Sequence, residues 1–292
     1  MSVSNVQHPI RARRVRFSYP LTMNRHYVDD DLIMSHAISM LSAVFPEGEE
    51  FFVKSVRHYS DDIADEALRS QVAGFIGQEI THGREHREIN ARLQDMGYPT
   101  WARERFTKRS LGLVYRAAPQ RMSLAITAAL EHYTATFAAL LLSEPKAREL
   151  ITSAEVRKLL LWHAYEEVEH KAVAFDVYRH IGGSETLRIW AMRVTHLAFL
   201  GSLCAATTVS MLCDRAAYNP VRLARSVSAL RGNPWFSRDL ARELRTYHRR
   251  GFHPDENDTT HLLERWSAEL FGDNGVLVPR VPRNRTEPGG HP

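Results

Sequence analysis

The sequence predicts an all-α fold, and three observations carry this prediction. Hydrophobic residues recur every three or four positions through several long segments, which is the spacing of one helix face. Alternating runs of β-branched residues bounded by turn residues, which would indicate strands, hardly occur. Proline and glycine stand near the borders of the long segments, where helices begin and end. With 292 residues and 44% hydrophobic content, the chain can bury a large core.

The first part of the chain is expected to be an irregular arm followed by two short helices and a long one. Residues 1–28 lack a helical pattern, and the acidic run 29–31 can cap the helix that follows. Proline is tolerated in the first turn of a helix, so a second helix is expected to start near Pro46 and to end near residue 60. A long helix spans residues 62–96 and stops at a glycine and a proline.

The rest of the chain is expected to contain a connection, more helices and a tail. Residues 97–119 are rich in charged and aromatic side chains and form the connection. One long crossover among four helices is the ferritin-like arrangement, so residues 29–272 are predicted to be a single ferritin-like four-helix bundle with extra C-terminal helices. Residues 273–292 hold four Pro and three Gly and are expected to be a disordered tail. Predicted helices lie at 120–143, 153–181, 184–214, and near 220–231, 235–250 and 256–271.

Composition argues against several classes of protein. The formal net charge of +4 is small, and both signs are mixed along the helices, so nucleic acid is not an expected partner. Cys204 and Cys213 stand in an apolar stretch without the spacing of a thiolate site, and we expect both to be buried. This usage and the polar, Arg-rich start predict a cytoplasmic setting.

Two of the predicted helices each contain a Glu-x-x-His pair, Glu79 with His82 and Glu167 with His170. Positions i and i+3 share one helix face, so the carboxylate and the imidazole of a pair can reach the same metal ion. Both pairs interrupt an apolar stripe that faces the core, where an uncompensated charge is costly. Metal ions would compensate these groups; a buried network of ion pairs is the alternative.

Two further carboxylates complete the set that a two-metal helical bundle needs. Glu131 is the only acid on the core-facing stripe of helix 120–143, and small residues surround it. Glu49 aligns with the apolar residues of its helix, whereas Glu50 aligns with basic ones, so we choose Glu49. The alternatives are that Glu131 pairs with a buried cation and that Glu49 only favours the helix dipole.

Other side chains near the two pairs are candidates as ligands or as residues that hold ligands in place. His163 lies one turn before Glu167, which gives His163-x3-Glu167-x2-His170 and makes His163 a candidate seventh ligand. His86, Glu166 and Asp176 are candidates for hydrogen bonds to the ligands. The predicted metal ligands are therefore Glu49, Glu79, His82, Glu131, His163, Glu167 and His170.

At these residues the chain resembles two known families. Segments 45–52, 75–83, 162–171 and 175–178, together with Arg250-Gly-Phe-His-Pro254, resemble the bacterial family described as predicted metal-dependent hydrolases, and the resemblance covers most of residues 10–270. The order of the seven ligands also resembles that of the di-iron arylamine N-oxygenases, which implies a di-iron centre. That pattern does not require His86, and outside the ligands we see no close match, so the substrate is not implied.

The mixed carboxylate and imidazole set suits two iron ions, with manganese or zinc as alternatives. The leading hypothesis is an O2-dependent oxidase or oxygenase that acts on a small apolar or aromatic substrate. No nucleotide loop or dinucleotide fingerprint occurs, so its electrons would come from a separate donor. A metal-dependent hydrolase is the alternative, and a non-catalytic metal-binding or iron-storage protein is the second alternative.

The predicted helix 184–214 contains an apolar run, residues 194–213, that is long enough to cross a bilayer. Its hydroxyl groups and His196 make it weakly hydrophobic for a span, so we expect it to pack across the bundle. It could line an apolar substrate tunnel, or lie against a membrane or a second subunit. A homodimer and a peripheral membrane contact therefore stay open.

Overall fold

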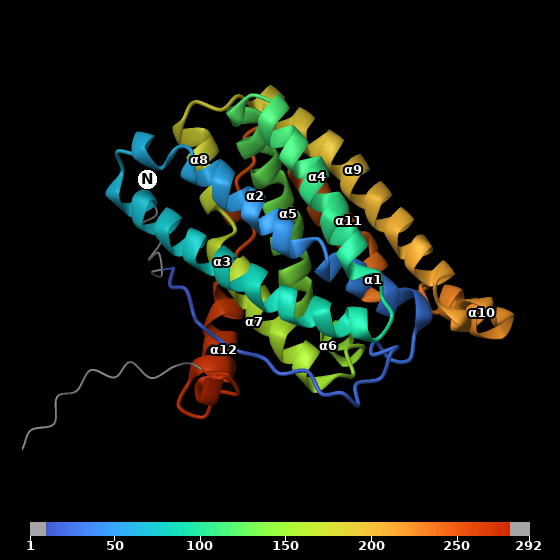
Figure 1. Ribbon diagram of the computed structural model, residues 1–292. Helices are drawn as coiled ribbons and strands as arrows, with labels where there is room; N and C mark the ends of the chain where they lie inside the picture. Colours follow the sequence, from blue (N-terminus) through green and yellow to red (C-terminus); the bar gives the residue numbers. More distant parts are fainter. Residues whose placement is uncertain (1–9, 281–292) are drawn as a thin grey trace, which may run out of the picture.

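The computed structural model describes residues 10–280, and within them it is built from helices without any β-strand. A single isolated bridge pairs Val28 with Ile151. The prediction of an all-α fold is therefore confirmed (Figure 1). The helices are α1 (Leu32–Ser42), α2 (Phe45–Arg57), α3 (Glu66–Asp95), α4 (Thr100–Ala117), α5 (Gln120–Ser143), α6 (Pro145–Glu149), α7 (Ala154–His170), α8 (Val173–His180), α9 (Glu185–Leu212), α10 (Pro220–Ala229), α11 (Arg238–Thr246) and α12 (Thr260–Phe271).

The starts of the first three helices follow from local sequence. The side chain of Asp31 accepts a hydrogen bond from the backbone N–H of Met34 and so caps α1. Pro46 stands in the first turn of α2, where its missing N–H leaves no helical hydrogen bond unmade. Asp65 caps α3 by accepting from two backbone N–H groups.

Two predicted boundaries were wrong. Residues 97–119, expected to be an irregular connection, contain the eighteen-residue helix α4. Its many Arg, Lys, Ala and Leu residues are good helix formers, and charge alone does not make a loop. The helix predicted at 153–181 is two helices, because α7 ends at His170 and α8 begins at Val173. Neither proline nor glycine stands at this break, so the sequence carried no signal for it.

The hydrophobic core consists of two clusters that meet near the middle of the long helices. On α3, Phe75 belongs to one cluster and Ile89 to the other. On α5, Leu124 belongs to the cluster of Phe75, and Leu142 belongs to the cluster of Ile89. The polar residues between them on these helices are therefore enclosed by apolar side chains on both sides.

The N-terminal arm packs along α3 and crosses to α7. Gly74 allows this close approach, because a Cβ atom at its position would clash with Ile10. Val15 and Phe17 are buried farther along the arm. Residues 10–28 of the arm are thus irregular in backbone, as expected, but they contribute to the core, whereas residues 1–9 lie outside the described residues.

Two expectations near the C-terminal half need correction. Cys204 and Cys213 are exposed rather than buried, because they lie on α9 and at its end on the side that faces away from the bundle. Residues 273–280 lie within the predicted disordered tail, yet Leu277 is fully buried and Arg280 forms an ion pair with Glu155. Residues 281–292, the remainder of that tail, lie outside the described residues.

Candidate metal centre

The seven predicted ligands come together at one place inside the helices. Each is at most 3% exposed, so the whole set is shielded from bulk water. Four helices supply them: α2 gives Glu49, α3 gives Glu79 and His82, α5 gives Glu131, and α7 gives His163, Glu167 and His170.

One group of donors consists of Glu49, His82 and His163. One donor atom of each lies within 4.8 Å of the others, which is close enough for all three to bind a single ion. The Glu49 Oε1 atom is 3.7 Å from His163 Nε2. The rings of His82 and His163 lie side by side, with their centroids 4.1 Å apart.

The second group consists of Glu79, Glu167 and His170, again with donor atoms within 4.8 Å of one another. The His170 Nε2 atom is 3.1 Å from Glu79 Oε1 and 3.7 Å from Glu167 Oε2. Glu131 joins this group, because its Oε2 atom is 3.4 Å from the same nitrogen. A single imidazole nitrogen thus faces three carboxylates.

The grouping differs from the expectation that each Glu-x-x-His pair serves one ion. Glu79 lies with His170, whereas His82 lies in the other group. Three residues along a helix correspond to about 4.5 Å of rise, so the two members of the pair on α3 lie in different donor groups instead of sharing one. Glu167 approaches both groups, with His163 Nε2 2.7 Å from its Oε1 atom and His82 Nδ1 3.7 Å from the same atom. This carboxylate is therefore placed to bridge.

A chain of hydrogen bonds fixes which nitrogen of His163 carries a proton. Asn90 Nδ2 donates to Glu104, so its Oδ1 atom accepts from the Ser42 hydroxyl. The Ser42 hydroxyl donates its only proton to Asn90, so His86 Nδ1 must donate to the hydroxyl oxygen. The other nitrogen of the neutral His86 ring, Nε2, must then accept from His163 Nδ1. In the neutral imidazole, His163 Nε2 is left with a lone pair that points at Glu167, 2.7 Å away. A proton or a metal ion at this position would satisfy both atoms.

The other two imidazoles are held in the same way. Gln78 Oε1 accepts from His170 Nδ1, which leaves His170 Nε2 for the three carboxylates. His82 Nε2 lies 2.9 Å from Glu166, and Arg13 binds that carboxylate from its other side. Burial raises the pKa of Glu166 to about 8 while Arg13 opposes the rise, so Glu166 accepts the proton of His82 Nε2 in its ionised form, above that pH. His82 Nδ1 then faces inward without a partner.

The inward-facing atoms of the centre lack hydrogen-bond partners among the described residues. Burial and the neighbouring carboxylates raise the pKa values of Glu49 and Glu79 well above the usual value. Burial raises the pKa of Glu131 to about 7. The same carboxylates raise the pKa of His170 well above its usual value, although burial opposes this rise. The pocket thus favours protons or other cations beside its carboxylates, and the donor set fits metal ions. The unpartnered atoms are both carboxylate oxygens of Glu49, Glu79 and Glu131, together with Glu167 Oε2, His82 Nδ1 and His170 Nε2.

The three residues expected to support the ligands have different positions. His86 and Glu166 each contact a ligand imidazole, as described above. Asp176 does not fit that expectation, because its carboxylate binds His253 Nε2 at 2.9 Å. It lies on α8, beyond the break that ends α7, so helical spacing from His170 misplaces it. Sequence reasoning also missed Gln78, although it directly precedes Glu79.

A third buried group, His26, His36 and Asp214, has the residue types of a metal site. Arg222 donates to His26 Nδ1, so His26 Nε2 must carry the proton that it donates to Asp214. Arg25 lies 3.2 Å from the same Asp214 oxygen. The group is therefore satisfied internally and is surrounded by cations. Its hydrogen bonds and ion pairs connect the arm, α1 and the end of α9.

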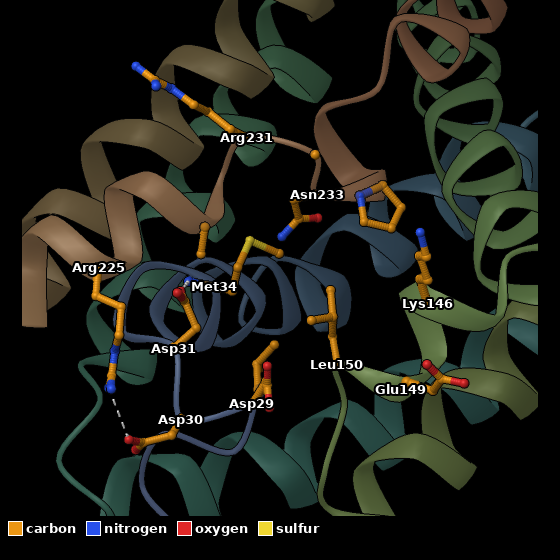
Figure 2. A pocket seen from close by; sticks show the side chains of 14 residues that line it. Asp29, Asp30, Asp31, Met34, Lys146, Glu149, Leu150, Arg225, Arg231 and Asn233 are labelled. Atoms are coloured by element: carbon orange, nitrogen blue, oxygen red, sulfur yellow. Dashed lines mark hydrogen bonds and ion pairs between the residues drawn. The ribbon is translucent and has the colours of Figure 1, made fainter.

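A surface pocket lies apart from the seven ligands, between the start of α1, α6 and the segment after α10 (Figure 2). Acids and bases both line it, and Arg225 is 3.4 Å from Asp30 across one side. None of the candidate ligands lines this pocket. Its charges are already partly paired, so it adds nothing to the metal centre.

Comparison with known proteins gives one match. The model of a protein family described as "Predicted metal-dependent hydrolase" matches residues 11–258, which include all seven candidate ligands. No curated protein and no solved structure matches the chain significantly. The ferritin-like assignment and the resemblance to arylamine N-oxygenases therefore stay predictions.

Proposed function

The chain belongs to the family of predicted metal-dependent hydrolases, and we propose that it is an enzyme whose reaction takes place at two metal ions held by the seven side chains. The observation that carries this proposal is the orientation of the three imidazoles. Each has one nitrogen hydrogen-bonded outward and the other directed at buried carboxylates. Residues that fix ligand tautomers in this way are typical of metal sites.

The residues divide naturally between two ion positions. Glu49, His82 and His163 would hold one ion, and Glu79, Glu131 and His170 the other, with Glu167 reaching both. The apolar clusters on either side exclude bulk water and so strengthen every charge interaction in the centre.

Hydrolysis is the first candidate reaction, because it is the activity named in the family description. Bound ions would polarise an ester or phosphate oxygen and lower the pKa of a coordinated water. The chain's own part would be to orient the substrate beside the carboxylates and to keep other water out. Zinc, manganese or iron would each fit this chemistry.

Oxidation with dioxygen is the second candidate, and the donor set favours it. Four glutamates and three histidines, all on helices, form the centre, and aspartate contributes none of them. Mixed carboxylate and imidazole donors suit iron, and helical bundles with paired Glu-x-x-His motifs are known for di-iron chemistry.

One set of measurements separates the two reactions. The full chain is stripped with a chelator and reloaded anaerobically with Fe(II), Mn(II) or Zn(II). Three quantities are then measured for each form: the metal content, the rate of cleavage of nitrophenyl acetate and nitrophenyl phosphate, and the rate of O2 consumption. Metal-dependent cleavage without O2 uptake supports hydrolysis, whereas O2 uptake by the Fe(II) form without cleavage supports oxidation.

Two alanine variants control the experiment. His170→Ala should lose bound metal and activity together. His132→Ala also removes a buried imidazole, but this one contacts the backbone oxygen of Glu243 outside the centre, so metal content should be unchanged. If His170→Ala keeps two ions per chain, the proposed centre is refuted.

A further inference from the structure

Helix α9 turns a long apolar face away from the rest of the protein. It has 28 residues, and its most apolar window has a mean hydropathy of 1.4 although only 11% of that window is buried. The helix is about 42 Å long at 1.5 Å per residue. The most exposed large side chains on it are Trp190, Val194, Leu197, Val209 and Leu212.

The opposite face of α9 is tied into the bundle, so the helix cannot leave it to cross a bilayer. The fully buried Arg188 donates hydrogen bonds to the backbone oxygens of Tyr247 and Arg249. Near the other end, the Ser210 hydroxyl bonds His36 on α1 at 2.7 Å. Breaking these buried polar contacts would be costly. The exposed face must therefore meet its partner while α9 stays in place.

Helix α4 extends this face beside α9. Figure 1 shows the two helices beside each other. Arg103 of α4 donates to the Ser202 hydroxyl of α9 at 3.1 Å, and its guanidinium lies over the ring of Phe106. Apolar and basic side chains alternate on the exposed surface of α4. The apolar ones are Trp101, Phe106 and Leu113, and the basic ones are Arg105, Lys108, Arg109 and Arg116.

Acids are nearly absent from the two helices. Glu104 is the only acid of α4, and it accepts a hydrogen bond from Asn90. Glu185 is the only acid of α9, and it is paired with Arg188. Lys108 is 3.6 Å from Glu47 of α2, whereas no ion pair is found for Arg105, Arg109 or Arg116 among the described residues. The face formed by α4 and α9 therefore combines exposed aromatic and aliphatic groups with a net positive charge.

We propose that the face formed by α4 and α9 docks on the surface of an anionic lipid bilayer. Apolar residues would enter the boundary between headgroups and acyl chains, and the cations of α4 would contact lipid phosphates and carboxylates. Charge complementarity selects this partner. A second copy of the chain packed through the same face would bring the cations of both α4 helices together.

The test uses the full chain and vesicles that differ only in charge. Co-sedimentation is measured with phosphatidylcholine vesicles and with an equal mixture of phosphatidylcholine and phosphatidylserine. We expect much tighter binding to the mixture, with an affinity that falls as salt rises. Since one cation near such a surface contributes about fivefold, Arg109→Gln should weaken binding about fivefold and the double variant Arg105→Gln/Arg109→Gln about thirtyfold.

Matched variants separate docking from general effects. Val209→Asp places a charge on the face of α9 and should weaken binding by about tenfold or more. Val276, near α12, is 52% exposed, and Val209 is 56% exposed. Val276→Asp is therefore a matched control, and it should not change vesicle binding. Arg265→Gln, also on α12, is the control for the arginine variants. All variants are checked for an unchanged thermal midpoint.

Two results would overturn the proposal. One is a failure to sediment with either kind of vesicle. The other is a stable dimer in solution that Val209→Asp dissociates and Val276→Asp does not, because the face would then be covered by a second copy. Metal content is unaffected by either result, so the proposed metal centre does not depend on this test.

Discussion

Replacing Glu131 by glutamine should stabilise the metal-free protein, and metal binding should remove that gain. In the metal-free protein, burial raises the pKa of Glu131 from 4.5 to about 7. Above pH 7, folding has to bury this carboxylate in its charged form, whereas glutamine has the same shape and no charge. At about 1.4 kcal/mol for each tenfold change in acidity, the difference corresponds to about 3 kcal/mol.

The sign and the pH range follow from linkage. A carboxyl whose pKa is higher in the folded state makes the protein less stable as pH rises from the unfolded pKa to the folded one. Metal-free Glu131→Gln should therefore be more stable than the metal-free parent by about 3 kcal/mol at pH 8 and by less than about 1 kcal/mol at pH 5.

Metal binding should cancel the benefit at pH 8. An ion present at a hundred times its dissociation constant stabilises the folded state by about 2.7 kcal/mol, so two ions contribute about 5 kcal/mol. Losing the Glu131 oxygens should reduce this increment to about half. The assay is urea unfolding followed by circular dichroism at both pH values, with chelator or with excess Mn(II). A metal-free variant that is less stable than its parent at pH 8 would refute the reasoning.

Three further predictions follow from contacts around the centre. Gln78→Leu removes the partner of His170 Nδ1 and should weaken metal affinity 10- to 100-fold without changing the number of ions at saturation, as measured by chelator competition. Gly74→Val would collide with Ile10, so it should displace the arm and make it sensitive to limited proteolysis, while α3 stays helical. Asp214→Asn should lower the free energy of unfolding by about 3 kcal/mol at pH 7, because it breaks a buried charged network. Burial raises the pKa of Asp214, but hydrogen bonds from Ala216, His26 and His36 outweigh burial and hold this pKa below its usual value. The loss should therefore shrink as pH falls below about 4, because the carboxyl of the unfolded chain then takes up a proton while the native carboxylate stays charged.

The sequence could predict which residues meet because helical periodicity is a strong physical constraint. Glu79, His82, Glu167 and His170 interrupt apolar stripes, and the stripes that carry them on α3 and α7 face the core. The same argument chose Glu49 over Glu50, and in the structure Glu49 is buried while Glu50 binds Lys54 near the surface.

Helical periodicity does not specify how one helix packs against another. The assignment of His82 to the group of His163 depends on the rise and crossing of α3 and α7, which no single helix encodes. Asp176 was misplaced because a break without proline or glycine shifts the face of α8 relative to α7. The role of Glu166 depends on Arg13, whose partner lies more than 150 residues away along the chain.

The arm has a consequence for how the protein is made. Arg13 holds Glu166 and Glu169 and lies over the ring of Phe271, so its contacts extend to the last helix of the described chain. During synthesis the arm leaves the ribosome before α7 and α12, so its contacts with these helices can form only after both have been made. The environment of His82 is therefore completed last, and we expect metal to be acquired after translation, by a chain that is already largely folded.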